Sequence, residues 1–251
     1  MRFLCMHKAD KDTEAGVPPS PELIASMGTL MQEMAKSGVL LAGEGLQPSS
    51  SSVRLKFCGG ERTVTRGPLC GANELLAGFA IVRMKSMEEA IEWASRFGRT
   101  MIDAEIDIGQ VKEPWDLGLC AKPTGQATRF MIMHKADNNS EAGILPTQNV
   151  MNHMSELTGK MPNTGTLLSS ERLQPSSKGA RLRFSGGKSK VIDGPFTEST
   201  ELIAGYSIVQ VTTREDAIEW ALRFAKVLGD SRVDSNVEVD ILPLCEISKS
   251  V

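Results

Sequence analysis

The segment RFLCMHKADKDTEAG at residues 2–16 returns as RFMIMHKADNNSEAG at residues 129–143. Ten of these fifteen positions are identical, at an offset of 127 residues. The same offset aligns LQPSS at residues 46–50 with residues 173–177, and AIEWA at residues 90–94 with residues 217–221. Chance does not produce three such matches in one register, so the chain is a tandem duplication of one module.

The limits of the two modules follow from this register. The first covers residues 1–112 and the second residues 129–247, with a linker at residues 113–128 that is rich in proline and glycine. Near the C-terminus the offset grows to 133, which pairs EIDI at residues 105–108 with EVDI at residues 238–241. The second module therefore has extra residues at positions 228–235, which we expect to form a loop.

The pattern of elements within one module predicts an α+β fold. Residues 2–8, 39–44, 53–57, 76–84 and 103–111 have the composition of strands, and Gly59-Gly60 is expected to form a hairpin turn. Ser20-Pro21 begins the first helix as N-cap and first helical residue, and a capping box of Ser86 and Glu89 begins the second, at residues 87–97. The order β-α-β-β-α-β with an added hairpin predicts two ferredoxin-like modules.

Apolar and charged residues alternate along these strands. RLKF at residues 54–57 and RLRF at residues 181–184 alternate basic with apolar side chains, and EIDI and EVDI alternate acidic with apolar ones. One face of each sheet is therefore apolar and must carry the helices. The other face would line an internal cavity, form ion pairs or lie in solvent. Open-faced modules of this kind often pair sheet to sheet, so we expect the two copies to form an intramolecular pseudo-dimer; further association into a homodimer stays open.

The composition is typical of a soluble globular protein, with 41% hydrophobic and 24% charged residues. A net charge of −3 gives no reason to expect nucleic acid as a partner. The sequence has no recognisable signal peptide and no apolar stretch of membrane-spanning length, so we expect a cytoplasmic protein without a membrane partner. Five scattered cysteines do not predict a disulfide framework or a zinc site, and Cys5 and Cys58 are expected to be buried free thiols.

The segment DGPFTESTELIAGY at residues 193–206 resembles the signature of the DGPF-domain branch of the YCII-related family. Residues 135–137, 141–143 and 173–179 resemble that branch too, as do residues 8–17 and 38–46 of the first copy. The resemblance covers almost all of both copies and implies a dimeric α+β barrel. In the first copy the signature reads RGPLCGANE at residues 66–74 and keeps only Gly67, Pro68 and Glu74.

A few YCII relatives are cofactor-free lyases acting on lactones, with a His–Asp pair proposed as their site, whereas many members have no known role. The resemblance therefore implies a lyase or isomerase that acts on a small-molecule substrate by acid–base chemistry, without metal or other cofactor. His134 and Asp193 of the second copy would be the acid and base. The alternative is a non-catalytic ligand-binding or regulatory module.

Histidine is the side chain best suited to proton transfer near neutral pH. His7 and His134 have equivalent positions near the end of the first strand of each copy, where a catalytic role and a structural hydrogen bond are both open. His153, in the first helix of the second copy, either contacts the ligand or is simply exposed. Three histidines without ligand spacing do not predict a metal site.

Charged residues complete the set of candidates. Asp193 could act as a base or cap a turn, and Glu201, which matches Glu74, could act beside it. Arg181 could bind a substrate carboxylate, because a guanidinium presents a planar fork of donors, or could pair with acidic strand residues. The further candidates for ligand binding are Arg54, Arg183, Glu44 and Glu171.

Overall fold

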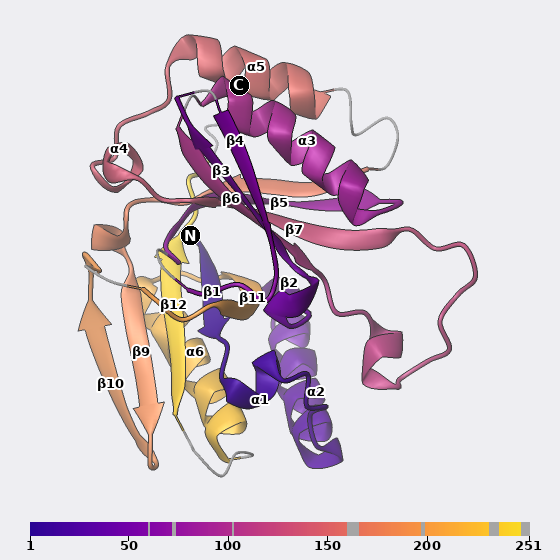
Figure 1. The fold of residues 1–251 in the computed structure, drawn as a ribbon. Coiled ribbons are helices and arrows are strands. Elements are labelled where there is room, and N and C mark those ends of the chain that lie inside the picture. Colours follow the sequence, from indigo (N-terminus) through magenta and orange to yellow (C-terminus); the bar gives the residue numbers. More distant parts are fainter. Residues whose placement is uncertain are drawn as a thin grey trace. The chain divides into compact units, whose positions relative to one another are not determined.

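A computed structural model of the chain describes residues 1–59, 61–71, 74–101, 103–159, 166–196, 199–230 and 236–246 (Figure 1). Its strands form two six-stranded antiparallel sheets, with the orders β10-β9-β12-β1-β11-β2 and β4-β3-β6-β7-β5-β8. The predicted α+β class is confirmed, and the two sheets are consistent with duplicated modules of the dimeric α+β barrel type. None of the described helices is long and apolar enough to cross a membrane.

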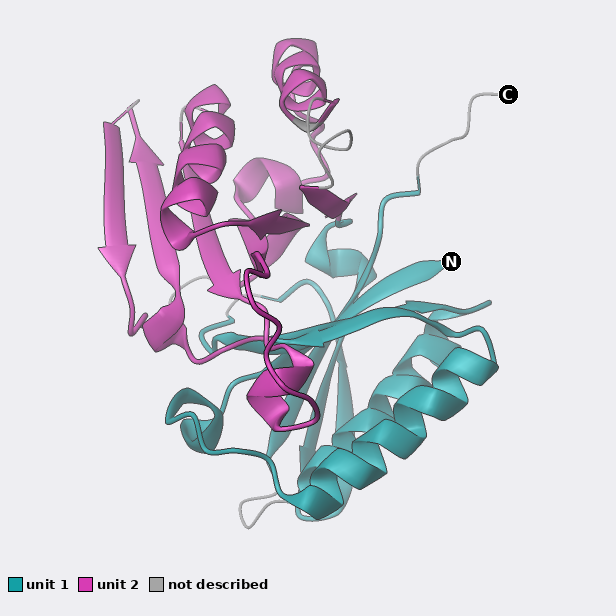
Figure 2. Cartoon of the chain, turned by 90° about the vertical axis from the view of Figure 1, so that its right-hand side faces the viewer, with its two compact units in different colours: residues 1–45, 173–251 teal, residues 46–172 magenta. Residues whose placement is uncertain are grey.

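The chain divides into two compact units, coloured separately in Figure 2. Unit 1 consists of residues 1–45 and 173–251. Its strands are β1 (Arg2–Lys8), β2 (Leu40–Gly45), β9 (Ala180–Ser185), β10 (Lys188–Asp193), β11 (Ile203–Gln210) and β12 (Val237–Pro243). Its helices are α1 (Lys11–Glu14), α2 (Pro21–Lys36), α6 (Arg214–Asp230) and the 3-10 turn η4 (Ser176–Lys178).

Unit 2 consists of residues 46–172. Its strands are β3 (Val53–Cys58), β4 (Glu61–Arg66), β5 (Leu76–Met84), β6 (Ala104–Gln110), β7 (Thr128–Lys135) and β8 (Leu167–Arg172). Its helices are α3 (Met87–Thr100), α4 (Asn138–Glu141) and α5 (Gln148–Gly159), with the 3-10 turns η1 (Ser49–Ser51) and η2 (Pro114–Leu117).

Each unit combines halves of both repeats. Strand β1 of the first repeat pairs with β11 and β12 of the second, and β7 of the second repeat pairs with β5 and β6 of the first. The compact units are therefore divided after Gly45 and Arg172, and not at the linker between the predicted modules. This exchange of strands between the repeats has a simple physical basis, because two copies of one sequence form sheets with nearly the same edge for an incoming strand.

The apolar faces of the sheets carry the helices, as predicted. In unit 1, Phe3, Leu182 and Ile241 are buried beneath α2 and α6, and in unit 2, Leu55 and Ile106 are buried beneath α3. Glycines allow the closest contacts: a Cβ at Gly98 of α3 would lie 2.2 Å from the Phe57 ring, and one at Gly229 of α6 would lie 2.4 Å from the Phe184 ring.

Local signals placed most elements correctly. Ser20 Oγ accepts a hydrogen bond from Leu23 N at 3.1 Å, and Ser86 Oγ accepts one from Glu89 N at 3.2 Å, so both helix starts are confirmed. Cys5 is buried, but the prediction for Cys58 is wrong: it is exposed, because it shares the outward face of β3 with Lys56. Residues 228–230 continue helix α6 and are not loop, and residues 231–235 lie outside the described part of the chain.

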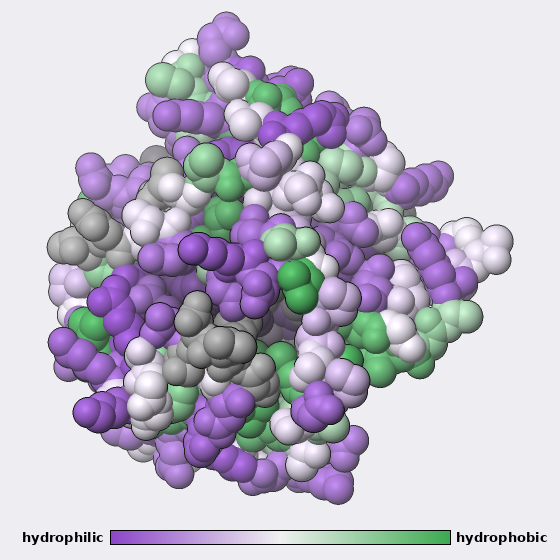
Figure 3. Space-filling model, turned by 60° about the horizontal axis from the view of Figure 1, so that its bottom comes forward, coloured by the Kyte–Doolittle hydropathy of each residue, from purple (hydrophilic) through white to green (hydrophobic). Residues whose placement is uncertain are grey.

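Hydrophilic side chains cover most of the surface shown in Figure 3, between scattered hydrophobic ones. Exposed large hydrophobic residues occur in both units and include Val17, Leu41, Ile144, Leu145 and Leu168. Single exposed apolar residues of this kind are normal on a protein surface and do not identify a site.

Candidate functional site

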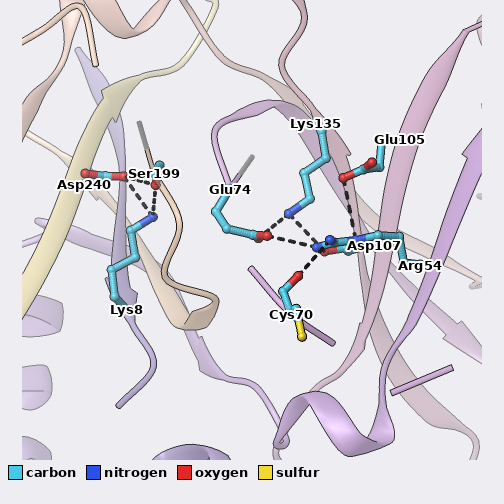
Figure 4. A network of polar contacts seen from close by, with 9 residues as sticks. All are labelled: Lys8, Arg54, Cys70, Glu74, Glu105, Asp107, Lys135, Ser199 and Asp240. Atoms are coloured by element: carbon cyan, nitrogen blue, oxygen red, sulfur yellow. Dashed lines mark hydrogen bonds and ion pairs between the residues drawn. The ribbon is translucent and has the colours of Figure 1, made fainter. Parts of the chain in front are cut away.

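Each sheet carries a buried ionic cluster on the face opposite its main apolar core, because the charged residues alternate with core residues along the strands. Figure 4 shows parts of both clusters. We call them ionic cluster 1, in unit 1, and ionic cluster 2, in unit 2. Cluster 1 consists of Lys8, Arg181, Ser199 and Asp240, and cluster 2 consists of Lys135, Arg54, Glu74 and Asp107.

Cluster 1 is centred on Asp240 of β12, whose side chain is fully buried. Arg181 of β9 contacts it in a bidentate manner, with Nε–Oδ1 at 2.6 Å and Nη2–Oδ2 at 3.0 Å. Lys8 Nζ of β1 lies 2.9 Å from Asp240 Oδ2 and donates a hydrogen bond to Ser199 Oγ at 2.8 Å. The aspartate therefore joins a strand of the first repeat to two elements of the second.

Cluster 2 repeats this arrangement around Asp107 of β6. Arg54 contacts its two carboxylate oxygens at 2.7 Å each, and Lys135 Nζ lies 2.9 Å from Asp107 Oδ2. Glu74 adds a second carboxylate, which accepts hydrogen bonds from Arg54 Nη2 at 2.9 Å and from Lys135 Nζ. The Glu74 side chain is 2% exposed, so cluster 2 contains two buried anions, the buried cation Lys135 and the partly exposed cation Arg54.

The two aspartates are held in the ionised form. Burial acts to raise the pKa of Asp240, but Lys8 and Arg181 outweigh it and the pKa is lowered. Burial likewise acts to raise the pKa of Asp107, and Arg54 and Lys135 lower it overall. Neither aspartate is suited to donate a proton at neutral pH, and both are suited to hold the neighbouring cations in place.

The clusters differ in one carboxylate. Glu201 has the position of Glu74 in the repeat but is exposed, and Ser199 occupies the contact to lysine in cluster 1. Among the described residues of unit 1, Asp240 is the one buried carboxylate. The partly exposed glutamates of the two sheets are equivalent, with Glu238 lying 3.3 Å from Arg181 and Glu105 lying 3.6 Å from Arg54. Cluster 1 therefore has a neutral hydroxyl at its lysine where cluster 2 has a carboxylate.

The DGPF segment supports Arg181. A Cβ at Gly194 would lie 1.8 Å from Ser176 O, so only glycine allows this turn to lie against η4. Phe196 N donates a hydrogen bond to Ser176 Oγ at 3.1 Å, and the Phe196 ring lies 4.6 Å from Arg181 Cζ. The signature therefore packs directly against the LQPSS segment, and its Phe196 side chain positions the guanidinium of Arg181.

The degenerate signature of the first repeat retains the close backbone contact with its LQPSS segment but lacks the aromatic contact to the arginine. A Cβ at Gly67 would also lie 1.8 Å from a backbone oxygen, that of Ser49. Leu69 N donates to Ser49 Oγ at 3.1 Å, but Leu69 stands where the second repeat has Phe196. The backbone requirement is thus common to both repeats, whereas the stacked guanidinium belongs to unit 1.

The predicted acid–base residues are not brought together within one unit. His134 belongs to unit 2, where its ring packs edge-on against Phe97 at 5.5 Å, and burial lowers its pKa against a smaller effect of Asp137. Asp193 belongs to unit 1, where it is largely exposed and pairs with Arg214. His7 of unit 1 packs against Phe224 at 5.3 Å.

The other candidates have varied surroundings. Arg183 is exposed and pairs with Glu238 at 2.7 Å. Glu44 of β2 and Glu171 of β8 are half-buried and lie opposite Tyr206 and Phe79, respectively. His153 is exposed on α5, with Nδ1 3.0 Å from Asn149 O. Of the predicted ligand-binding residues, Arg181 and Arg54 are the two that belong to the clusters.

Two cavities of unit 1 are candidate sites. One, between the sheet and helices α2 and α6, has a volume of about 10 Å³ and is lined by Cys5, Ser207 and apolar residues. It holds at most one water molecule, and burial raises the pKa of the Cys5 thiol to about 12 against a hydrogen bond with Ser207. The other is an open groove of about 420 Å³ beside Asp216, Trp220 and Arg223. None of the predicted site residues lines either cavity.

Sequence reasoning missed Lys8, Lys135 and Ser199 as site residues. The signal for the lysines was present, because each follows the candidate histidine in the repeated HKAD segment and alternation places it on the opposite, charged face of the sheet. The segment around Ser199 differs between the repeats, so no pattern pointed to it.

Comparisons with known proteins give a family and no activity. The model of the YCII-related domain matches residues 1–104 and 128–229. An uncharacterized protein of Rhizobium meliloti (strain 1021) is 32% identical over 74 residues, which are 30% of this chain and 60% of that protein. The phosphoribosylaminoimidazole carboxylase ATPase subunit from Aquifex aeolicus matches at 13% identity over 84% of this chain and 74% of its own, with a TM-score of 0.19, too low to support an argument. The chain belongs to the YCII-related domain family, of which it carries two copies.

Proposed function

We propose that this protein binds a small molecule at ionic cluster 1 of unit 1. The proposal is carried by the Ser199 hydroxyl, which contacts the lysine of cluster 1 where cluster 2 has the carboxylate of Glu74. Burying a charge without a counter-charge is costly, and cluster 2 neutralises the same pair of cations with Glu74. A purely structural role would be served by the same set of groups in both units, so the difference between the clusters favours a bound ligand.

The groups of cluster 1 are suited to binding. Lys8 supplies a compact charge with three donors, and Ser199 supplies a hydroxyl that both donates and accepts. Arg181 is held by Asp240 on one side and stacks on Phe196 on another, so its orientation is set before a ligand arrives. Preorganised groups bind with a smaller loss of conformational entropy.

Thermal unfolding in the presence of a library of small metabolites tests the proposal. A ligand of cluster 1 should raise the melting temperature of the wild type and of Lys135→Met, which changes the equivalent lysine of cluster 2. It should not raise that of Lys8→Met. Equal stabilisation of Lys8→Met and Lys135→Met by every active compound would contradict the proposal.

A cofactor-independent enzyme of the lyase or isomerase type is the second candidate function. Its support is His134, whose lowered pKa keeps the imidazole neutral and able to accept a proton at pH 7. Asp193 pairs with Arg214 in unit 1, the unit that contains His7 and not His134. Compounds that stabilise the protein should then be converted, and His134→Gln or His7→Gln should abolish the conversion while binding persists. Unchanged turnover in both variants would remove this candidate.

A further inference from the structure

We infer that strand β4 of one chain pairs with strand β10 of a second copy of this chain, parallel and in register, so that Val64 lies beside Val191. The contact would join unit 2 of one copy to unit 1 of the other, and it does not depend on a ligand at cluster 1. Three features of the two strands support it: their free edges, their regular shape and the reversal of charge between them.

Strands β4 and β10 are the last strands of their sheets. Among the described strands, β4 pairs with β3 and β10 pairs with β9, and Figure 1 shows β10 at the outer edge of its sheet. All side chains of β4 are exposed, as are those of β10 apart from the half-buried Ile192. The outward backbone groups of both strands are therefore accessible to a further strand.

The two strands are also regular, unlike the strands at the opposite edges of the sheets. The register of β2 and of β8 shifts within the strand, and such a bulge bends an edge away from a partner. Strands β4 and β10 have six residues each, and their pairing with β3 and β9 is continuous. Their outer edges are thus the better templates for pairing.

An exposed valine occupies the same position in both strands. Val64 is 39% exposed and Val191 is 40% exposed, and they are equivalent in the repeat. They lie opposite the core residues Leu55 and Leu182, so each valine is on the face of its sheet that carries the helices. Pairing with Val64 beside Val191 would therefore keep the helices of both units on one face of a continuous sheet and cover two apolar side chains.

The charges at the two ends of the strands are reversed. Glu61 begins β4 where Lys188 begins β10, and Arg66 ends β4 where Asp193 ends β10. Parallel pairing in register would place each charge beside its opposite. Parallel self-pairing of either strand would place like charges side by side, and antiparallel self-pairing of β4 about its valine would set Arg62 opposite Arg66. Charged residues at a sheet edge oppose pairing in general, and their signs here select the other edge as the partner.

The partners that the end residues have within their own units leave them accessible. Arg66 pairs with Glu88 at 3.2 Å, yet 60% of its side chain is exposed. Asp193 pairs with Arg214, and 78% of its side chain is exposed. Each of the two can therefore contact a second charged group.

The association should be weak and reversible. Two six-residue strands bury less area than the roughly 1,200 Å² at the lower end of stable interfaces. The contact is head-to-tail, so each copy has one strand of either kind to offer and assembly can continue beyond two copies. The mean mass in sedimentation velocity should rise with protein concentration, and added salt should lower it because the ion pairs are exposed.

Reversing the charges of one strand tests the choice of partner. The full-length double variant Glu61→Lys, Arg66→Asp should associate roughly tenfold less tightly or worse than the wild type, because both end contacts become repulsive. Adding Lys188→Glu and Asp193→Arg reverses the second strand as well and should restore association. The matched control is Glu92→Lys, Arg96→Asp, which exchanges the same residue types in an exposed pair of α3 and should behave as the wild type.

Cross-linking tests the register. Val64→Cys and Val191→Cys are introduced separately, in a chain whose cysteines other than the buried Cys5 are changed to serine. A short bismaleimide should link the two variants when they are mixed, and neither variant to itself. Asp193→Cys should be linked to Arg66→Cys more readily than to Arg62→Cys. The substituted side chains are exposed, and circular dichroism verifies that each variant is folded.

Several results would overturn the inference. A single mass at every concentration would show that the edges do not pair. Equal association of the Glu61→Lys, Arg66→Asp variant and its control would show that the charges do not select the partner. Links within Val64→Cys alone would indicate self-pairing of β4, and preferential linking of Asp193→Cys to Arg62→Cys would indicate antiparallel strands.

Discussion

Lys8 of the first repeat and Asp240 of the second form a buried ion pair, with Nζ and Oδ2 2.9 Å apart and side chains 3% and 0% exposed. Strands β1 and β12, which carry the two residues, are neighbours in one sheet although they belong to different repeats. Lys135 and Asp107 form the equivalent pair in unit 2, also at 2.9 Å. Each ion pair therefore links a strand of the first repeat to a strand of the second repeat within one unit.

Replacing Asp240 with alanine should destabilise the protein strongly. The change leaves Lys8 and Arg181 buried without their shared counter-ion, and removing one partner of a buried pair costs about 3–5 kcal/mol. Urea denaturation measures the loss. Asp230→Ala is the matched control, because Asp230 and Lys226 form an exposed ion pair and such pairs contribute little to the free energy of unfolding. Similar losses in the two variants would show that cluster 1 does not stabilise unit 1.

Gly194→Ala should also be destabilising, for a steric reason. The new Cβ would lie 1.8 Å from Ser176 O, so the backbone of the signature turn or of η4 must move. The cost should reach the upper range for single substitutions, about 4 kcal/mol. Gly28→Ala is the control: it lies within helix α2, its Cβ would meet nothing within 4 Å, and it should stabilise by up to about 1 kcal/mol. A denaturation midpoint equal to that of the wild type would show that the backbone at Gly194 does not pack this closely against Ser176.

The sequence predicted the repeat, the strands, the helix starts and the faces of the sheets, because these depend on local patterns. It could not predict which copy completes each sheet, since β1 and β7 differ at few positions and alternation says nothing about the partner strand. The sequence assigned His134 and Asp193 to one module, whereas the structure places them in different compact units. The buried position of Glu74 and the exposed position of Glu201 depend on loop backbone, which no periodic pattern encodes.

His134 should make the stability of the protein depend on pH. Its pKa is lowered in the folded state by burial, so the unfolded chain takes up a proton at higher pH. The stabilising contribution of the neutral imidazole is complete above the unfolded pKa of about 6.5 and is lost as the pH falls through the lower folded value. Urea midpoints measured from pH 8 to pH 5 should therefore decrease.

Variants assign this decrease to His134. His134→Gln should flatten the dependence, because the side chain no longer titrates, whereas His153→Gln, at the exposed histidine of α5, should keep the wild-type slope. Comparing slopes between variants removes the contribution of all other titrating groups. If the slope of His134→Gln equals that of the wild type, the burial of this imidazole does not influence stability.

Cutting the chain between the repeats should not separate them. Strand β1 is hydrogen-bonded to β11 and β12, and β7 to β5 and β6, so fragments 1–118 and 119–251 each contain some strands of both sheets. Co-expressed fragments should copurify as a 1:1 complex with the circular dichroism of the intact chain. Each fragment alone has an unpaired sheet edge and an incomplete core, and should be unfolded or should associate with itself by the same exchange. Light scattering after size exclusion distinguishes these states, and a folded monomer of residues 1–118 would show that the first repeat completes its own sheet.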